Sequence, residues 1–434
     1  MNYQETLHYL FNKLPMFSRI GAAAYKADLT NTIALCKAIQ NPQQNFKTIH
    51  IAGTNGKGST SHMLAAIFQA AGYKTGLYTS PHLKDFRERI KINGKVCTEE
   101  FVINFTQKIQ PQIEFIEPSF FEITVAMAFE YFALEQVDIA IIETGLGGRL
   151  DSTNIITPEL SIITNIGFDH MNFLGNTLDK IAFEKAGIIK HNIPVVIGEK
   201  HAETISVFNK KAAKENAAIV YAEDVYSIYN IEYNEQFLAV QVTNHKANLG
   251  STYKLDLSGI YQSKNLITVL TAIQILQNQG WNISEENITM ALRQVKKITG
   301  LHGRWELLQT NPNIVADVGH NADGIKQITQ QLAISKYKKL HIVVGMVKDK
   351  DIKAAIALLP QKATYYFTQA QIERALPANE MQQLAANFNL VGNSFATVNI
   401  AIQEAQKNAT KDDLILVCGS VFLVGEIDLL TMDN

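Results

Sequence analysis

The sequence is poor in cysteine and has no surplus of charge of either sign. Its 434 residues include only three cysteines, Cys36, Cys97 and Cys418, which lie far apart and form no CxxC pair. A disulfide framework or a cysteine zinc site is therefore not expected, and a reducing compartment fits. The formal net charge is −2, which gives no electrostatic reason to expect nucleic acid or an anionic membrane surface as a partner.

Long apolar runs are also missing. No segment approaches the roughly 20 apolar residues that a membrane helix needs. The start, MNYQETLHYLFNKLPMF, lacks the basic region and apolar region of a secretory signal. We therefore expect a cytoplasmic protein without a membrane partner. The chain is too long for one ordinary core, so two domains are expected.

Short strand-like runs alternate with helical stretches along most of the chain. VDIAIIETG, LSIITNIG and IPVVIGE are apolar on both faces, which is typical of central strands in a parallel sheet. Helical stretches are predicted around 100–110, 121–135 and 177–190. The segment 217–257 has alternating strands without a long helix and predicts a small antiparallel sheet.

A second unit is predicted after the polar segment KKITGLHGRWE, whose Gly300 and Gly303 indicate a hinge. The alternation of strand-like and helical stretches then restarts, with strands predicted at NIVADVG, KLHIVVGMV, ATYYFTQ and DLILVCGS. The sequence thus predicts an α/β protein with two domains. Residues 1–297 form a P-loop-type domain with a mainly parallel sheet and the small antiparallel sheet, and residues 298–434 form a Rossmann-like α/β domain.

A glycine-rich loop follows the first strand, within HIAGTNGKGSTSHML at 50–64. The usual phosphate-binding pattern G-x-x-x-x-G-K-[ST] does not fit, because Ile51 and Gly58 stand where glycine and Ser or Thr are required. Three glycines within six residues can still turn backbone N–H groups toward a phosphate, and a helix predicted from about Ser59 adds positive potential. Lys57 supplies a point charge for phosphate oxygens. The alternative is an ordinary strand–helix turn with a solvated lysine.

GTNGKGS resembles the loop of the Mur ligase superfamily, especially of folylpolyglutamate synthases and dihydrofolate synthases, in which the shortened loop is normal. Further blocks resemble this family in the same order: YTSPHLKDFRERIKING, FFEITVAMAFEYF, ETGLGGRLDSTN, GFDHMNFLGNTLDKIAFEKAGIIK, GRWE, DVGHNADG, KDKD, ERALP and GSVFLVGE. The resemblance spans nearly the whole chain. It implies that the loop binds ATP through Gly53, Thr54, Asn55, Gly56, Lys57, Gly58 and Ser59.

Three side chains follow predicted strands where open α/β sheets place ligands. Glu143 ends VDIAIIE, and its carboxylate suits Mg²⁺, a hard cation, although a structural cap is the alternative. The resemblance implies that Ser80 and Glu143 hold a first magnesium and that His170 holds a second. From the residues alone, Ser80 is a turn residue and His170 a core histidine.

Lys185 lies in the block EKAGI. The resemblance implies that its ε-amine is carbamylated, which replaces a cation by an anion and removes a like-charge conflict with the two Mg²⁺ ions. It also implies a catalytic role for Lys57, His170 and Lys185. Without the resemblance, Lys185 is a surface helix residue.

The resemblance places further ATP contacts around the second domain, at Asn265, Arg304, Asp317 and His320. The family pattern D-G-A-H-N is altered here, because Val318 and Gly319 occupy its middle positions. For Arg304 the alternative is a salt bridge at the hinge.

The resemblance implies amide ligation: ATP phosphorylates a carboxylate, and the amine of L-glutamate attacks the acyl phosphate. The acceptor is dihydropteroate or a reduced folate, with Phe121 stacking on the pterin and Asp151 bonding its amino groups. Either Phe120 or Phe121 is also expected to pack in the core. A monofunctional folylpolyglutamate synthase and a P-loop ATPase switch are the alternatives to a bifunctional enzyme. We expect a monomer.

Overall fold

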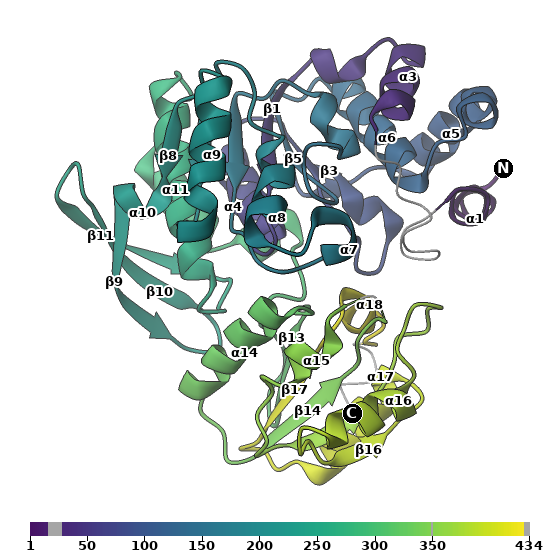
Figure 1. The fold of residues 1–434 in the computed structure, drawn as a ribbon, viewed down its shortest axis with the longest axis vertical. Coiled ribbons are helices and arrows are strands. Elements are labelled where there is room, and N and C mark those ends of the chain that lie inside the picture. Colours follow the sequence, from purple (N-terminus) through teal and green to yellow (C-terminus); the bar gives the residue numbers. More distant parts are fainter. Residues whose placement is uncertain (16–27, 349, 429–434) are drawn as a thin grey trace.

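The computed structural model describes residues 1–15, 28–348 and 350–428. Three sheets organise this part of the chain (Figure 1). An eight-stranded sheet has the order β4-β3-β2-β5-β1-β6-β7-β8, a three-stranded sheet the order β11-β10-β9, and a six-stranded sheet the order β12-β13-β17-β14-β15-β16. The two large sheets are mainly parallel and the small one is antiparallel, so the predicted α/β class is confirmed.

The three sheets are built mostly from short strands, and the central strands of the eight-stranded sheet are apolar. In chain order the strands are β1 (Lys47–Ala52), β2 (Thr75–Tyr78), β3 (Ile90–Ile92), β4 (Lys95–Val96), β5 (Ile139–Glu143), β6 (Leu160–Ile163), β7 (Val195–Ile197), β8 (Ile219–Tyr221), β9 (Tyr226–Tyr233), β10 (Leu238–Asn244), β11 (Leu249–Leu255), β12 (Glu306–Gln309), β13 (Asn313–Asp317), β14 (Leu340–Val344), β15 (Thr364–Phe367), β16 (Gly392–Ser394) and β17 (Leu414–Cys418).

Helices cover both faces of each large sheet. Successive residues of β5 point to opposite faces, so Ile141 belongs to a core cluster with residues of α4, α11 and α12, while Ile142 belongs to a second cluster with residues of α1, α3, α5 and α6. The helices are α1 (Tyr3–Lys13), α3 (Thr30–Ala38), α4 (Lys57–Ala70), α5 (Glu99–Ile116), α6 (Phe120–Leu134), α7 (Met171–Leu174), α8 (Leu178–Ala186), α9 (Ala202–Lys214), α10 (Ala222–Val225), α11 (Gln262–Asn278), α12 (Glu285–Leu292), α13 (Val295–Thr299), α14 (Ala322–Ile334), α15 (Ile352–Ile356), α16 (Ala378–Ala386), α17 (Val398–Asn408) and α18 (Val421–Gly425).

Several element boundaries differ from the sequence prediction. The small antiparallel sheet covers 226–255 rather than 217–257, because β8 pairs in parallel with β7 of the large sheet. The helix predicted from about Ser59 begins at Lys57, and Gly56 precedes it in a left-handed conformation. No helix among the described residues is long and apolar enough to cross a membrane.

The connection between the two large sheets is held at the end of α13. Gly300 ends this helix with a φ of 65°, a value that favours glycine. The buried Lys91 of β3 donates to the carbonyl oxygens of Thr299 and Gly300, at 2.8 and 3.1 Å. His62 of α4 bonds the Thr299 hydroxyl at 2.7 Å. The predicted domain boundary near 298 falls inside α13, and the division into 1–297 and 298–434 stays a prediction.

The Lys91 contacts predict a measurable contribution to stability. Lys91→Met removes a cation from two buried carbonyl groups, and we expect it to lower the free energy of unfolding by about 2 kcal/mol. Lys95→Met, at an exposed position of the same hairpin, is the control and should change it by less than about 0.5 kcal/mol. Urea unfolding measures both, and equal midpoints for the two variants would contradict the assigned role.

Candidate functional site

A cavity of about 450 Å³ is lined by residues that follow the carboxyl ends of strands in both large sheets. Residues far apart in the chain line it. Every residue predicted from the sequence to belong to the site lines this cavity: Gly53, Thr54, Asn55, Gly56, Lys57, Gly58, Ser59, Ser80, Phe121, Glu143, Asp151, His170, Lys185, Asn265, Arg304, Asp317 and His320. The structure thus brings them together, while the role of each stays a prediction.

The glycine-rich loop approaches other side chains too closely for larger residues. Gly53 and Gly56 have φ values of 152° and 85°. A Cβ on Gly53 would lie 1.9 Å from the Thr164 hydroxyl oxygen, and one on Gly56 would lie 2.4 Å from Oδ1 of Asn265. The loop leads directly into the N-terminus of α4, where unpaired N–H groups and the helix dipole favour an anion. This geometry fits a phosphate group.

Two lysines converge on one carbonyl of this loop. Lys57 Nζ lies 3.1 Å from the carbonyl oxygen of Gly53, and Lys185 Nζ lies 2.8 Å from the same oxygen. Lys185 comes from α8 and is only 4% exposed. Burial, and then the neighbouring Lys57, lower the pKa of Lys185 to about 7. Lys185 is therefore a buried amine, not the surface residue that the sequence alone indicates.

Glu143 ends β5 beneath the loop and is 4% exposed. Burial raises the pKa of its carboxyl to about 7, although Lys57 and Arg304 oppose the rise. A Cβ on Gly58 would lie 3.4 Å from Nη2 of Arg304 and 3.7 Å from Oε2 of Glu143. The loop, Glu143 and the second domain's Arg304 therefore meet at one point of the cavity.

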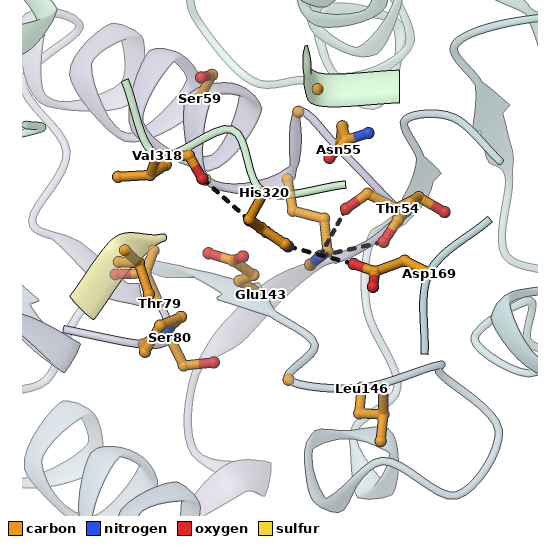
Figure 2. A pocket seen from close by; sticks show the side chains of 18 of the residues that line it. Thr54, Asn55, Ser59, Thr79, Ser80, Glu143, Leu146, Asp169, Val318 and His320 are labelled. Atoms are coloured by element: carbon orange, nitrogen blue, oxygen red, sulfur yellow. Dashed lines mark hydrogen bonds and ion pairs between the residues drawn. The ribbon is translucent and has the colours of Figure 1, made fainter. Parts of the chain in front are cut away.

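Asp169 joins the two sheets across the cavity, and Figure 2 shows its contact with His320. Its Oδ1 lies 2.5 Å from Nζ of Lys350, and its Oδ2 lies 3.3 Å from Nε2 of His320. Burial alone would raise the pKa of Asp169, but the hydrogen bond with His320 and the charge of Lys350 hold it well below its usual range. The amides of Asn55 and Asn321 also exchange hydrogen bonds, at 3.1 and 3.3 Å.

His170 is a partly buried imidazole, with 23% of its side chain exposed. Burial lowers its pKa to about 3, which Asp169 opposes. Its Nε2 lies 3.0 Å from Nζ of Lys350. A neutral imidazole suits a metal, but a metal at this nitrogen requires Lys350 to withdraw.

Asp317 and Asn265 mainly contact protein groups. Oδ2 of Asp317 accepts hydrogen bonds from the Tyr261 hydroxyl and the Trp305 backbone, at 2.6 and 2.9 Å. Asn265 Nδ2 donates to Gln262 at 2.8 Å. Both residues line the cavity, so they shape it even where their polar atoms are already engaged.

One end of the cavity is aromatic. Phe120 is buried among Phe11 and Phe86, with ring centroids 5.4 and 5.9 Å away, which confirms that one of the two phenylalanines packs in the core. Phe121 lines the cavity, and its ring lies against Gly145, where a Cβ would be 2.4 Å from Cζ. Asp151 lines the same end and is almost fully buried.

The sequence did not single out several residues of the site. Lys350, Asn321, Arg374 and Phe422 all line the cavity or bond across it. They lie in the blocks KDKD, DVGHNADG, ERALP and GSVFLVGE, so the family resemblance and the position of these blocks in the second unit were signals that could have found them. Which charged partner each one meets depends on how the two sheets face each other.

The residues present fit Mg²⁺ only together with a ligand. Among residues 1–15, 28–348 and 350–428, no three His, Cys, Asp or Glu side chains form a metal-binding cluster. Mg²⁺ in phosphate-transfer sites is commonly held by one or two carboxylates together with phosphate oxygens and water. Glu143, a buried carboxylate next to the Ser80 backbone, and the nearby phosphate loop match that kind of site.

Comparison with known proteins agrees with this geometry. Residues 51–273 match the Mur ligase middle domain, and residues 303–421 match the Mur ligase glutamate ligase domain. Fold and site together therefore define a Mur-type ATP-dependent amide ligase. At 32% identity over 438 residues, 98% of each chain, the sequence is similar to the dihydrofolate synthase/folylpolyglutamate synthase of Bacillus subtilis. The chain belongs to the dihydrofolate synthase/folylpolyglutamate synthase family.

Solved structures of this family are similar over the whole chain. Escherichia coli FolC in complex with DHPP and ADP has a TM-score of 0.86 and 27% identity, and the match covers 100% of this chain and 98% of that one. A bifunctional folylpolyglutamate synthase/dihydrofolate synthase with Mn, AMPPNP and L-glutamate bound has a TM-score of 0.84 and 26% identity, with 100% and 98% covered.

The burial of Glu143 generates a prediction about metal. Glu143→Gln keeps the shape of the side chain but removes its charge, so we expect activity to fall at least about tenfold and the magnesium requirement to rise. Burial raises the carboxyl pKa from 4.5 to about 7, so ionising this group costs folding free energy that grows between these two pH values and is complete above the higher one. At neutral pH the variant should therefore unfold at an equal or higher temperature than the wild type.

Glu130→Gln provides the control for this experiment. Glu130 is a buried carboxylate of α6 that pairs with Lys108 at 2.5 Å, outside the cavity. Its loss should leave the magnesium titration unchanged. A Glu143→Gln protein with wild-type magnesium dependence would make Glu143 a structural cap.

Proposed function

We propose that this protein uses ATP to join L-glutamate to dihydropteroate and to folyl(poly)glutamate, through an acyl phosphate. One observation carries the proposal: the glycine-rich loop and α4, the buried Glu143 and the second domain's Arg304 meet in a single cavity. Family membership supports the reaction class. L-glutamate and DHPP are named as bound in structures of relatives, which supports the substrates.

ATP would lie between the two large sheets. The N–H groups of the loop and the N-terminus of α4 face the phosphates, and Lys57 turns from the Gly53 carbonyl to a phosphate oxygen. Arg304 approaches from the second domain, and Asn265, Asp317 and His320 border the rest of the nucleotide. A nucleotide between two domains favours their closure, which excludes water from a labile intermediate.

The reaction has two steps. A carboxylate oxygen of the acceptor attacks the γ-phosphorus, the bond to the bridging oxygen breaks, and ADP leaves. The neutral amine of L-glutamate then attacks the acyl carbon, phosphate leaves, and the amine gives up a proton. Side chains form no covalent bond to substrate in either step. Lys57 and the loop N–H groups act by placing the phosphoryl group and stabilising its charge.

Two Mg²⁺ ions are part of the proposal. Ser80 and Glu143 would hold the first and His170 the second, each together with phosphate oxygens. Bound Mg²⁺ neutralises charge on the phosphates during transfer. The relative solved with Mn and AMPPNP supports a divalent metal beside the nucleotide.

A carbamate on Lys185 is also proposed. With a pKa of about 7, a large share of this amine is neutral near neutral pH. Its nitrogen can attack CO₂, forming an N–C bond and releasing one proton. The side chain changes from cation to anion, which removes the repulsion between Lys185 and Lys57. An anion at this place favours nearby metal ions.

The acceptor end of the cavity is proposed to bind the pterin. Phe121 would stack on its ring, and Asp151 would accept hydrogen bonds from its N–H groups.

We also propose that the protein acts as a monomer, since one chain supplies all of the cavity lining described above.

ADP release with and without L-glutamate tests the proposed function. Ligation predicts that ADP forms only when L-glutamate and an acceptor are both present, with dihydropteroate and with a reduced folate tested separately. Activity with the reduced folate but not with dihydropteroate would indicate a monofunctional folylpolyglutamate synthase. ADP release that ignores L-glutamate would contradict ligation and favour an ATPase switch.

Variants of Lys185 test the carbamate. Lys185→Ala should lose activity by roughly 100-fold, and short carboxylic acids should restore part of it by supplying an anion. Lys185→Arg should fail as badly, because it restores only positive charge. Lys190→Arg is the control, since Lys190 is a partly buried lysine that donates to the Asn154 carbonyl oxygen at 2.9 Å, and it should stay active.

Carbon NMR with labelled bicarbonate detects the carbamate directly. An active enzyme whose Lys185 amine carries no carbon label would refute the modification, as would a Lys185→Arg protein with wild-type activity.

A further inference from the structure

A buried chain of hydrogen bonds stands behind the acceptor end of the cavity. Nε2 of His50 lies 2.8 Å from Oγ1 of Thr153, and that hydroxyl lies 2.5 Å from Oδ1 of Asp151. Only Asp151 of the three lines the cavity. His50 is fully buried on β1, three residues before the glycine-rich loop begins.

The protons of this chain can be placed by counting donors. Oδ1 of Asp151 also accepts from the Thr153 backbone N–H at 3.0 Å, and Oδ2 accepts from the Leu146 N–H at 2.8 Å. Burial raises the pKa of Asp151, but the Thr153 hydroxyl and the backbone donors on both oxygens oppose the rise and favour the ionised carboxylate. The Thr153 hydroxyl has one proton and uses it to donate a hydrogen bond to Asp151. Nε2 of His50 must therefore carry the proton of the other hydrogen bond, in which the Thr153 oxygen is the acceptor. The chain therefore runs in one direction, from imidazole to hydroxyl to carboxylate.

Retaining a histidine in this strand has a cost. Nδ1 of His50 is buried without a hydrogen-bond partner among the described residues. A buried unsatisfied group costs about 1–3 kcal/mol, which an apolar side chain like those of Ile49 and Ile51 would avoid. The stability of the fold therefore does not explain why a histidine occupies this position. The hydrogen bond from its imidazole to Thr153 does.

We propose that His50 and Thr153 are positioning residues that fix the Asp151 carboxylate for the acceptor substrate. The terminal torsion of an aspartate is broad, and the hydroxyl of Thr153 holds one carboxylate oxygen, which fixes the orientation of the carboxylate at the cavity wall. A carboxylate held in this way recognises a flat ring with N–H donors, the chemistry of an aminopyrimidine. The inference rests on the proposed function, because it assigns Asp151 to the acceptor.

The conformation of the segment 145–154, which carries Asp151, does not depend on the Thr153 hydroxyl. Nδ2 of Asn154 donates to the carbonyl oxygens of Arg149 and Gly187, at 3.0 and 3.1 Å. The backbone bonds from Leu146 and Thr153 to Asp151 also remain when the Thr153 hydroxyl is lost. Thr153→Val, which keeps the shape of the side chain, should therefore fold.

The test separates the substrates by KM. Thr153→Val should raise KM for dihydropteroate, or for the reduced folate, by about tenfold, the effect of losing one hydrogen bond to a charged group. KM for ATP and for L-glutamate should stay within about twofold. Thr153→Ser restores the hydroxyl and should restore most of the acceptor KM. His50→Leu should behave like Thr153→Val, since it removes the donor to that hydroxyl.

Thr106→Val is the matched control. Thr106 is equally buried in the same domain, and its hydroxyl donates to Val102 of its own helix at 2.8 Å. It should leave all three KM values unchanged. Direct binding of dihydropteroate to the ADP-loaded protein, measured by calorimetry, should show the same ranking of variants.

Several results would overturn the inference alone: an unchanged acceptor KM in Thr153→Val, an equal rise in all three KM values, or a Thr153→Ser protein as impaired as Thr153→Val. A wild-type protein that releases no ADP in response to L-glutamate with either acceptor would instead overturn the proposed function, and this inference with it.

Discussion

The cost of burying charge governs this site. Glu143 and Lys185 are both 4% exposed, and burial moves their pKa values toward each other, the carboxyl upward and the amine downward, to about 7. Removing a charge from water costs several kcal/mol unless a partner compensates. A triphosphate with its metal ions supplies charge of both signs at this point. The free energy that the fold loses by burying these groups can therefore be recovered when substrate binds.

The position of the charged groups follows from how the two large sheets face each other. Both present their carboxyl ends to the same cavity, so loops that are 266 residues apart, at Asn55 and Asn321, exchange hydrogen bonds. Asp169 binds Lys350 and His320 across the same gap. The contacts that join the two large sheets thus lie among the groups that would hold the nucleotide, so the relative placement of the sheets and the geometry of the site depend on the same side chains.

Local sequence patterns predicted the parts of the site that depend on one strand and one turn. The glycine-rich loop and Glu143 each follow an apolar strand, and their place at a sheet edge follows from that alone. Lys185 could be placed only through family resemblance, since its burial depends on packing of α8 against the loop. The bonds of Asp317 to Tyr261 and Trp305, and the pairing of Lys350, depend on three-dimensional contacts that no local pattern encodes.

The central claim is that ATP activates a carboxylate as an acyl phosphate before L-glutamate attacks. The most direct measurement follows oxygen from an acceptor whose carboxylate is labelled with ¹⁸O, using phosphorus NMR of the phosphate released during turnover with ATP and L-glutamate. Because the acyl carbon keeps one carboxylate oxygen and phosphate takes the other, the account predicts ¹⁸O in the phosphate in step with amide formation. Unlabelled phosphate released while the amide forms would contradict it.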